Sequence, residues 1–291
     1  MTGHSTPAQG GVTDDPIRIG TILYTLVEPH RGHEVAYNRW YERDHLYAGC
    51  MIGAYNFAGA RFVATAGLKG LRYPEGDGAL VADPSTGSYL ALYYVLDGHH
   101  DEWNRWSVDQ VNTLHAAGRM FPHRDHIHTG LYRFEWEHRR DPDGVPAELT
   151  LDHRFPGMVS VFIDAAEGVT GAEVGAWLRG TWLPSLPPGS PVATVLGFSP
   201  LPLLADAPGD VPRVEPLSER VLALCFVDEA PDACWDTVFG PLGAALSGAG
   251  MGDVVWASPF IGTVPGTDTY TDQLWSDGGS DPSGSRPDPG A

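Results

Sequence analysis

The residues best suited to proton-transfer chemistry are the histidines, and they are unevenly distributed along the chain. Eleven of the 12 lie between His30 and His153, and none follows His153. An imidazole of ordinary basicity can both give and take a proton at neutral pH. The distribution therefore predicts that any chemistry is confined to the first half of the chain, with the second half acting as a packing partner or lid.

Four polar side chains are spaced to share one face of a helix expected at residues 33–51. The stripe consists of Glu34, Asn38, Tyr41 and His45, at spacings of four, three and four residues. It either faces solvent or forms the rim of a pocket. In a pocket, we expect the helix dipole to stabilise His45 as imidazolium near the carboxyl end of the helix. Tyr41 and Asn38 would then orient a carbonyl group or stabilise an enolate.

A second histidine cluster lies between a helix expected at residues 102–120 and a strand expected at 128–136. It contains His123, His126 and His128. Strand alternation predicts that His126 and His128 point to the same side. The spacing matches no established metal signature, so acid–base chemistry by His123 and His126 is favoured, with metal binding as the alternative.

The expected substrate-binding residues are three aromatic side chains and one histidine. Aromatic residues in strands and helices pack first of all in the core, and some also line apolar ligand cavities. The set is Trp40, Tyr94, Trp106 and His128. Such a lining suits a largely apolar substrate that bears a carbonyl group.

Several enzyme classes lack their main sequence cue in this chain. It contains no GxSxG elbow, no GxxxxGK phosphate loop and no GxGxxG motif after a strand. The three cysteines, Cys50, Cys225 and Cys234, form no CxxC pair, which argues against a disulfide framework or a zinc knuckle. Cys50 is either a nucleophile or, as is commoner, a buried structural thiol.

Charge and hydropathy limit the partners. The formal net charge is -19, which repels nucleic acid and anionic membrane surfaces. No apolar stretch approaches the roughly 20 residues that cross a bilayer. Residues 1–15 lack the basic start and apolar run of a secretion signal, so a cytoplasmic location is expected.

The elements that must position these residues recur in the same order in both halves. In the first half, residues 16–137, strands are expected at 17–27, 54–65, 88–96 and 128–136, with helices at 33–51 and 102–120. In the second half, residues 157–271, strands are expected at 158–164, 192–200, 220–228 and 254–264, with helices at 171–186 and 232–247. A linker at 138–156 joins the halves, and residues 1–15 and 272–291 are expected to be disordered.

This repeat predicts an α+β fold of two tandem ferredoxin-like βαββαβ units. A sheet covered by helices on one face leaves the other face apolar, and a second sheet laid against that face buries it. We therefore expect the two sheets to pack as an intrachain dimeric α/β barrel. The alternative is an ordinary α+β chain whose halves match by chance.

The segment Asn38-Arg-Trp-Tyr-Glu-Arg-Asp-His45, followed by Gly59-Ala-Arg-Phe62, resembles the opening of EthD-like proteins of the dimeric α/β-barrel superfamily. The resemblance covers about 30 residues. The second half has a tryptophan-containing helix at the corresponding place but lacks the asparagine and the histidine. The resemblance implies a barrel with a ligand cavity between sheet and helices, and it carries over Tyr41 and His45 as site residues. The superfamily includes cyclases, isomerases, cofactor-free monooxygenases and haem enzymes, so the fold does not settle the function.

The expected function is that of a cofactor-independent enzyme of secondary metabolism. Histidine and tyrosine would move protons in a cyclisation, isomerisation or lyase step, with His45 or His126 as the base. The alternatives are a monooxygenase, either cofactor-free or dependent on haem, and a non-catalytic protein that binds a small ligand. A homodimer is compatible with the sequence, and a bound metal ion is kept as a minor alternative.

Overall fold

The computed structural model describes residues 17–205, 209 and 219–276. The expected disorder of residues 1–15, and of the tail from residue 277 onward, lies outside the described residues. Within them, the order of strands and helices expected from the sequence is present in both halves.

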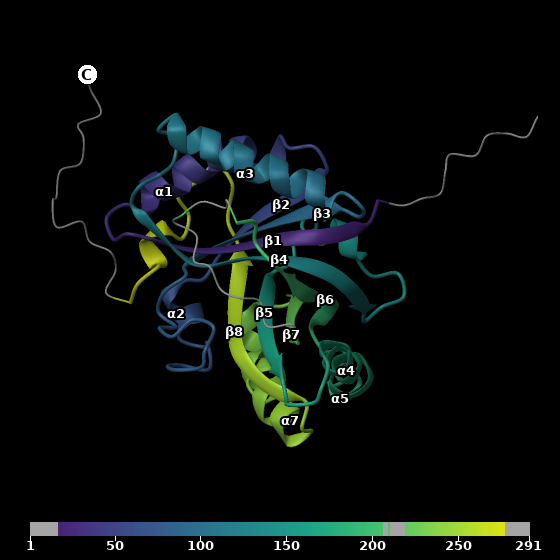
Figure 1. The fold of residues 1–291 in the computed structure, drawn as a ribbon. Helices are drawn as coiled ribbons and strands as arrows, with labels where there is room; N and C mark the ends of the chain where they lie inside the picture. The colour runs from purple at the N-terminus through teal and green to yellow at the C-terminus, as the bar shows by residue number, and fades with distance from the viewer. Residues whose placement is uncertain (1–16, 206–208, 210–218, 277–291) are drawn as a thin grey trace, which may run out of the picture.

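In the described part of the chain, eight strands form one closed antiparallel barrel in the order β1-β3-β2-β8-β5-β7-β6-β4 (Figure 1). Each half contributes four neighbouring strands, and in each half the fourth strand lies beside the first, followed by the third and the second. The halves meet where β2 pairs with β8 and where β4 pairs with β6. The strands are β1 Ile19–Pro29, β2 Asn56–Val63, β3 Tyr89–Leu96, β4 Arg124–Arg139, β5 Gly157–Ala165, β6 Val192–Leu201, β7 Arg220–Val227 and β8 Gly252–Gly262.

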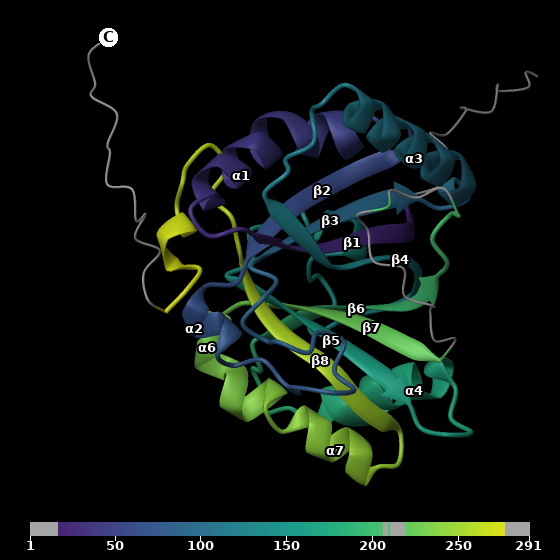
Figure 2. The same ribbon diagram turned by 60° about the vertical axis from the view of Figure 1, so that its left-hand side comes forward.

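Helices cover the outside of the barrel, one group over each half (Figure 2). Over the first half lie α1, its π-helical continuation η1, and α3; over the second lie α4 and α7. The first-half helices are α1 Glu34–Trp40, η1 Tyr41–Met51, α2 Ala66–Lys69 and α3 His100–Ala116, followed by the short η2 Ala147–Leu149. The remaining helices are α4 Gly171–Trp177, η3 Leu178–Trp182, α5 Leu183–Ser185, α6 Pro231–Cys234, η4 Trp235–Phe239, α7 Leu242–Gly248 and η5 Thr271–Gln273.

Alternation along β1 shows how the sequence divides the inside of the barrel from the outside. Tyr24 and Leu26 belong to the barrel core, whereas Val27 packs on the helix side. The Tyr24 hydroxyl bonds the Ser160 hydroxyl at 3.1 Å, and its ring meets Phe162 edge-on. Packed side chains fill the barrel interior, and β1 presents Thr25 toward the helices.

The segment expected as a linker, residues 138–156, is partly structural. β4 extends into it as far as Arg139, and Ala147 and Phe155 pack against the barrel core. The Thr150 hydroxyl bonds the Tyr94 hydroxyl at 2.8 Å.

The segment after β8 returns to the first half, which corrects the expectation that disorder begins at residue 272. Leu274 is fully buried, and the Trp275 indole donates to Glu28 at 3.0 Å. Nearer to β8, the Thr267 carbonyl accepts a hydrogen bond from Asn38 at 2.9 Å. The acidic, glycine-rich composition of this segment predicted disorder, but the segment also contains Leu274 and Trp275. Burial of these two apolar side chains stabilises the segment against the first half.

Candidate active site

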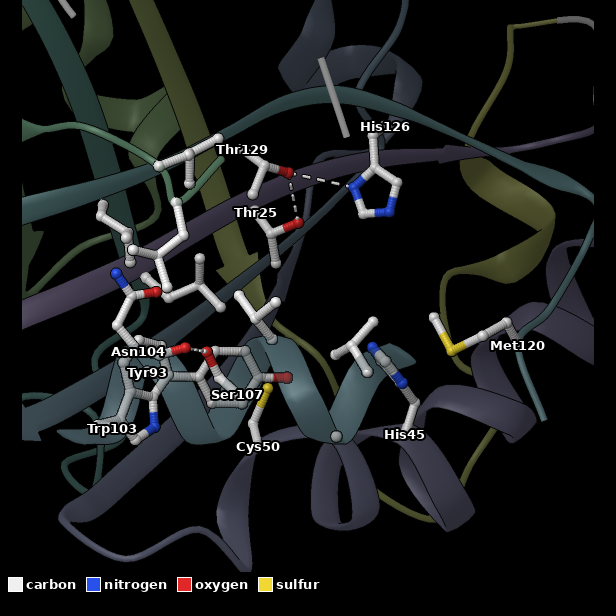
Figure 3. Close-up of a pocket in the computed structure, with 17 residues that line it drawn as sticks. Thr25, His45, Cys50, Tyr93, Trp103, Asn104, Ser107, Met120, His126 and Thr129 are labelled. Carbon is white, nitrogen blue, oxygen red and sulfur yellow. Dashed lines mark hydrogen bonds between the residues drawn. The ribbon is translucent and has the colours of Figure 1, made fainter. Parts of the chain in front are cut away.

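A cavity of about 110 Å³ lies between the outer face of the first-half strands of the barrel and the helical layer formed by η1 and α3. Its size is of the same order as the cavity of about 150 Å³ that is known to bind benzene. Most lining side chains are apolar, and the polar groups include two imidazoles, two threonine hydroxyls and one phenol (Figure 3). These groups come from β1, η1, β3 and β4.

His126 on β4 faces this cavity, as its predicted role requires. Its Nδ1 lies 3.1 Å from the Thr129 hydroxyl, which lies 3.0 Å from the Thr25 hydroxyl. Its Nε2 is 3.4 Å from the guanidinium of Arg124. In Figure 3 Thr129 contacts one edge of the ring and is itself bonded to Thr25, and the other edge points toward the open space shared with His45.

His45 on η1 forms part of the opposite wall; its side chain is partly buried, and its Nδ1 atom is buried. Its ring stacks on Trp40 at a centroid distance of 4.6 Å, and its Nδ1 has no hydrogen-bond partner among the described residues. Burial, with smaller contributions from Arg124 and His126, lowers the pKa of His45 to about 3. His45 is therefore neutral at neutral pH, which corrects the expectation of a dipole-stabilised imidazolium. Desolvation of the charged form outweighs the helix dipole here, and the helical segment continues for six residues beyond His45.

Tyr41 reaches the cavity only through a second phenol, Tyr93. The two hydroxyls are 2.8 Å apart, and Tyr93 lines the cavity whereas Tyr41 does not. Burial raises the pKa of Tyr41 and that of Tyr93 well above the usual range, so both phenols stay protonated. Cys50, beside Tyr93, has its pKa raised to about 12 by burial, which agrees with a structural thiol.

The structure places Asn38 outside the cavity. Its amide nitrogen donates to the Thr267 carbonyl at 2.9 Å, and its amide oxygen accepts from Arg61 at 2.8 Å. The predicted stripe therefore divides: His45 faces the cavity, and Asn38 ties α1 to Arg61 and to the segment that follows β8. Glu34, at the start of the stripe, does not line the cavity either.

His123 also lies away from the cavity. Its ring stacks on His33 at 3.8 Å, and His30 lies 6.1 Å away. The structure thus separates His123 from His126, with which it was grouped. No group of three or more histidine, cysteine or acidic side chains that could hold a metal ion occurs among the described residues.

His128 points into the barrel, on the side opposite to His126, which contradicts the expectation that the two share a face. The pairing register shifts at this point, with Leu26 opposite His128 and Val27 opposite His126. One extra residue, Ile127, therefore forms a bulge that reverses the alternation. His128 lies 2.6 Å from the Tyr132 hydroxyl, and burial lowers the pKa of His128 to about 3.

The three aromatic residues expected to bind substrate do not line the cavity directly. Trp40 supports His45 from behind, and its indole donates to the Arg119 carbonyl at 2.8 Å. Tyr94 points into the barrel toward Thr150. Trp106 packs near Val95 and Trp103, close to Gly53.

Besides Asn104 and Ser107 on α3, the sequence analysis missed three polar cavity residues that belong to the barrel: Thr25, Tyr93 and Thr129. All three lie on strands, where threonine and tyrosine are ordinary residues. Alternation was the signal that could have identified them, because Tyr93 lies on the face opposite to Tyr94. For Thr129 that signal required knowledge of the bulge.

No protein-family model matches the chain, and no curated protein matches it. Among solved structures, an anthrone oxidase-like protein matches with a TM-score of 0.47 and 10% identity, over 87% of this chain and 98% of the other. A candidate monooxygenase from Fusobacterium nucleatum subsp. nucleatum gives 0.44 and 7%, over 86% and 97%. A Dyp-type peroxidase-like protein from Shewanella oneidensis gives 0.43 and 8%, over 88% and 95%. At this level of similarity, the function has to be argued from the chain's own residues.

Proposed function

We propose that this chain is a cofactor-independent small-molecule enzyme that moves a proton on a largely apolar, carbonyl-bearing substrate. The step is a cyclisation, an isomerisation or a lyase reaction. The observation that carries the proposal is the buried Nδ1 of His45, which lacks a partner among the described residues and belongs to a ring in the wall of a cavity that His126 also lines. A buried polar atom of this kind is costly unless a ligand or a water molecule satisfies it.

The two imidazoles have different roles in this proposal. His126 takes the proton from the carbon next to the carbonyl group through Nε2. Its Nδ1 stays in contact with Thr129, and the substrate displaces the contact of Nε2 with the Arg124 guanidinium at 3.4 Å. The pKa of His45 is about 3, so its ring is neutral at neutral pH. In this proposal His45 forms a hydrogen bond with the substrate and does not act as the base. The apolar walls exclude water from the enolate that forms.

The family and the repeat are part of the same proposal. The Asn38–His45 motif and the identical strand order of the two halves support an EthD-like chain built from two ferredoxin-like units. A haem does not fit the cavity as described, because about 110 Å³ is well below the several hundred Å³ of sites for larger ligands. We therefore propose no role for haem.

The part of the chain that the structure describes contains no helix with the length and apolar character needed to cross a bilayer.

Proton exchange tests the proposal without knowledge of the natural substrate. The purified protein is incubated in D₂O with acetophenone and with 2-tetralone, and loss of the proton signals next to the carbonyl group is followed by NMR. We expect exchange above the buffer rate for at least one ketone. His126→Ala should reduce it about 100-fold, and His45→Ala should reduce it by a comparable factor.

The matched control is His153→Ala, because His153 is exposed and its ring contacts Phe155. This variant should exchange at the wild-type rate. Wild-type rates in both cavity variants would refute the assignment of the two imidazoles. Oxygen uptake with either ketone, without deuterium incorporation, would instead support the monooxygenase alternative.

A further inference from the structure

Tyr93 is the phenol with direct access to the cavity. It lies on β3, on the face covered by η1, and it is fully buried. Its hydroxyl contacts two groups, the Tyr41 hydroxyl at 2.8 Å and the Cys50 thiol. Figure 3 shows Tyr93 at the cavity wall beside Cys50.

The two phenols hold two protons but make only one hydrogen bond with each other. Each phenol keeps its proton, because burial raises both pKa values. A hydroxyl donates once and accepts up to twice. The phenol that accepts in the shared bond therefore has its proton left for another acceptor.

The position of Arg61 favours one of the two phenols as the donor. Its guanidinium lies over the Tyr41 ring, 4.5 Å from the ring centroid, and it is held by Asn38 at 2.8 Å. A nearby positive charge makes a phenol a better proton donor, and Arg61 acts on Tyr41 in this way. The geometry allows either hydroxyl to donate, and this charge favours Tyr41 as the donor and Tyr93 as the acceptor. The remaining proton of Tyr93 is then shared between the sulfur of Cys50, which is a weak acceptor, and the cavity.

We infer that Tyr93 donates a hydrogen bond to the carbonyl oxygen of the ligand, and that Tyr41 is a positioning residue that turns the Tyr93 proton toward that oxygen. A carbonyl oxygen accepts more strongly than a thiol, so the ligand displaces the contact with Cys50. The inference rests on the proposed function only in placing a carbonyl-bearing ligand in this cavity. The sequence analysis expected Tyr41 to contact the ligand, whereas this inference assigns that contact to Tyr93.

The carbonyl stretching band of bound acetophenone, labelled with ¹³C at the carbonyl carbon, measures this hydrogen bond. The band should lie at lower frequency in the wild-type protein than in Tyr93→Phe, and that variant should bind acetophenone about threefold to tenfold more weakly. Tyr41→Phe should broaden the band or shift it part of the way, because the Tyr93 proton is no longer directed. Cys50→Ala should move the band further to low frequency, because the competing acceptor is removed.

Tyr94→Phe is the matched control, because Tyr94 is the next residue on the same strand and its hydroxyl bonds Thr150 on the other face. It should leave the band unchanged. Equal bands in the wild-type protein and Tyr93→Phe, an equal shift in Tyr94→Phe, or no binding of acetophenone would each overturn the inference. His126→Ala should keep the wild-type band while losing proton exchange. A wild-type protein that gives the expected band without any exchange would refute the proposed function alone.

Discussion

The two halves of the barrel differ around one matched position of their first helices. In both halves the first helix passes from α-helix to π-helix directly after a tryptophan, Trp40 in the first half and Trp177 in the second. The fifth residue after that tryptophan is His45 in the first half and Trp182 in the second. His45 borders a cavity, whereas Trp182 is buried in a continuous apolar layer.

The sheet surfaces beneath these helices differ in the same sense. In the second half, the residues that face the helices are mainly small and aliphatic, such as Val159, Val161 and Ala223, and large rings such as Trp235 and Phe239 cover them. In the first half, Thr25 and Tyr93 occupy the same layer. One strand order thus supports either a close-packed layer or a cavity with a few polar groups in its apolar walls, and the difference lies in a few side chains.

The largest expected effect comes from opening the second half. Trp182→Ala removes a buried indole that packs near Phe239, with ring centroids 6.3 Å apart. We expect a loss of about 3–5 kcal/mol in the free energy of unfolding, measured by denaturant titration. Trp177→Ala is the control, because Trp177 is only half-buried and should cost less. Equal costs for the two would contradict a close-packed second half.

Closing the first half is the reverse experiment. His45→Trp places the second-half residue in the cavity wall, and the larger ring should fill the space that His45 leaves open. We expect acetophenone binding to weaken at least about 100-fold in calorimetry, and the larger ring to lower the free energy of unfolding by about 1–3 kcal/mol. His123→Trp, a change outside the cavity, should bind normally. Retained binding in His45→Trp would show that the ligand lies elsewhere.

Acid sensitivity should also separate the halves, because the two histidines with strongly lowered pKa values both lie in the first half. The pKa values of His45 and His128 are about 3 in the folded state, against an ordinary value of 6.5. The fold favours the neutral forms, so their contribution is fully present above pH 6.5 and is lost as the pH falls toward 3. Protonation of each of these two histidines should lower the free energy of unfolding by up to about 1.4 kcal/mol per pH unit in that range.

The measurement is the free energy of unfolding as a function of pH. His128→Gln should flatten the slope between pH 6.5 and 3, and His153→Gln, which changes an exposed residue, should leave it unchanged. An unaltered slope in His128→Gln would mean that this imidazole is already protonated in the folded protein.

The sequence predicted the order of elements because apolar alternation and helical spacing are local signals. The two histidines expected to act as the base, His45 and His126, line one cavity, and their role stays a prediction. The sequence could not reveal the bulge at Ile127, because the register of β4 depends on its pairing with β1. Nor could it show that the Asn38 amide would donate a hydrogen bond to the carbonyl of Thr267, a residue more than 200 positions away. Long-range contacts of this kind leave no local pattern.

The smallest expected effect concerns the threonine pair that orients His126. Thr129→Val keeps the shape of the side chain but removes the hydroxyl that lies 3.1 Å from Nδ1 of His126 and 3.0 Å from the hydroxyl of Thr25. A neutral hydrogen bond contributes about 0.5–1.5 kcal/mol, so proton exchange should slow about threefold to tenfold while acetophenone binding stays near the wild-type value. Thr150→Val is the matched control, because Thr150 bonds Tyr94 on the barrel side, and it should alter stability rather than exchange. If Thr129→Val exchanged at the wild-type rate, the ring of His126 would be oriented by its other contacts, Arg124 among them, and the threonines would serve packing alone.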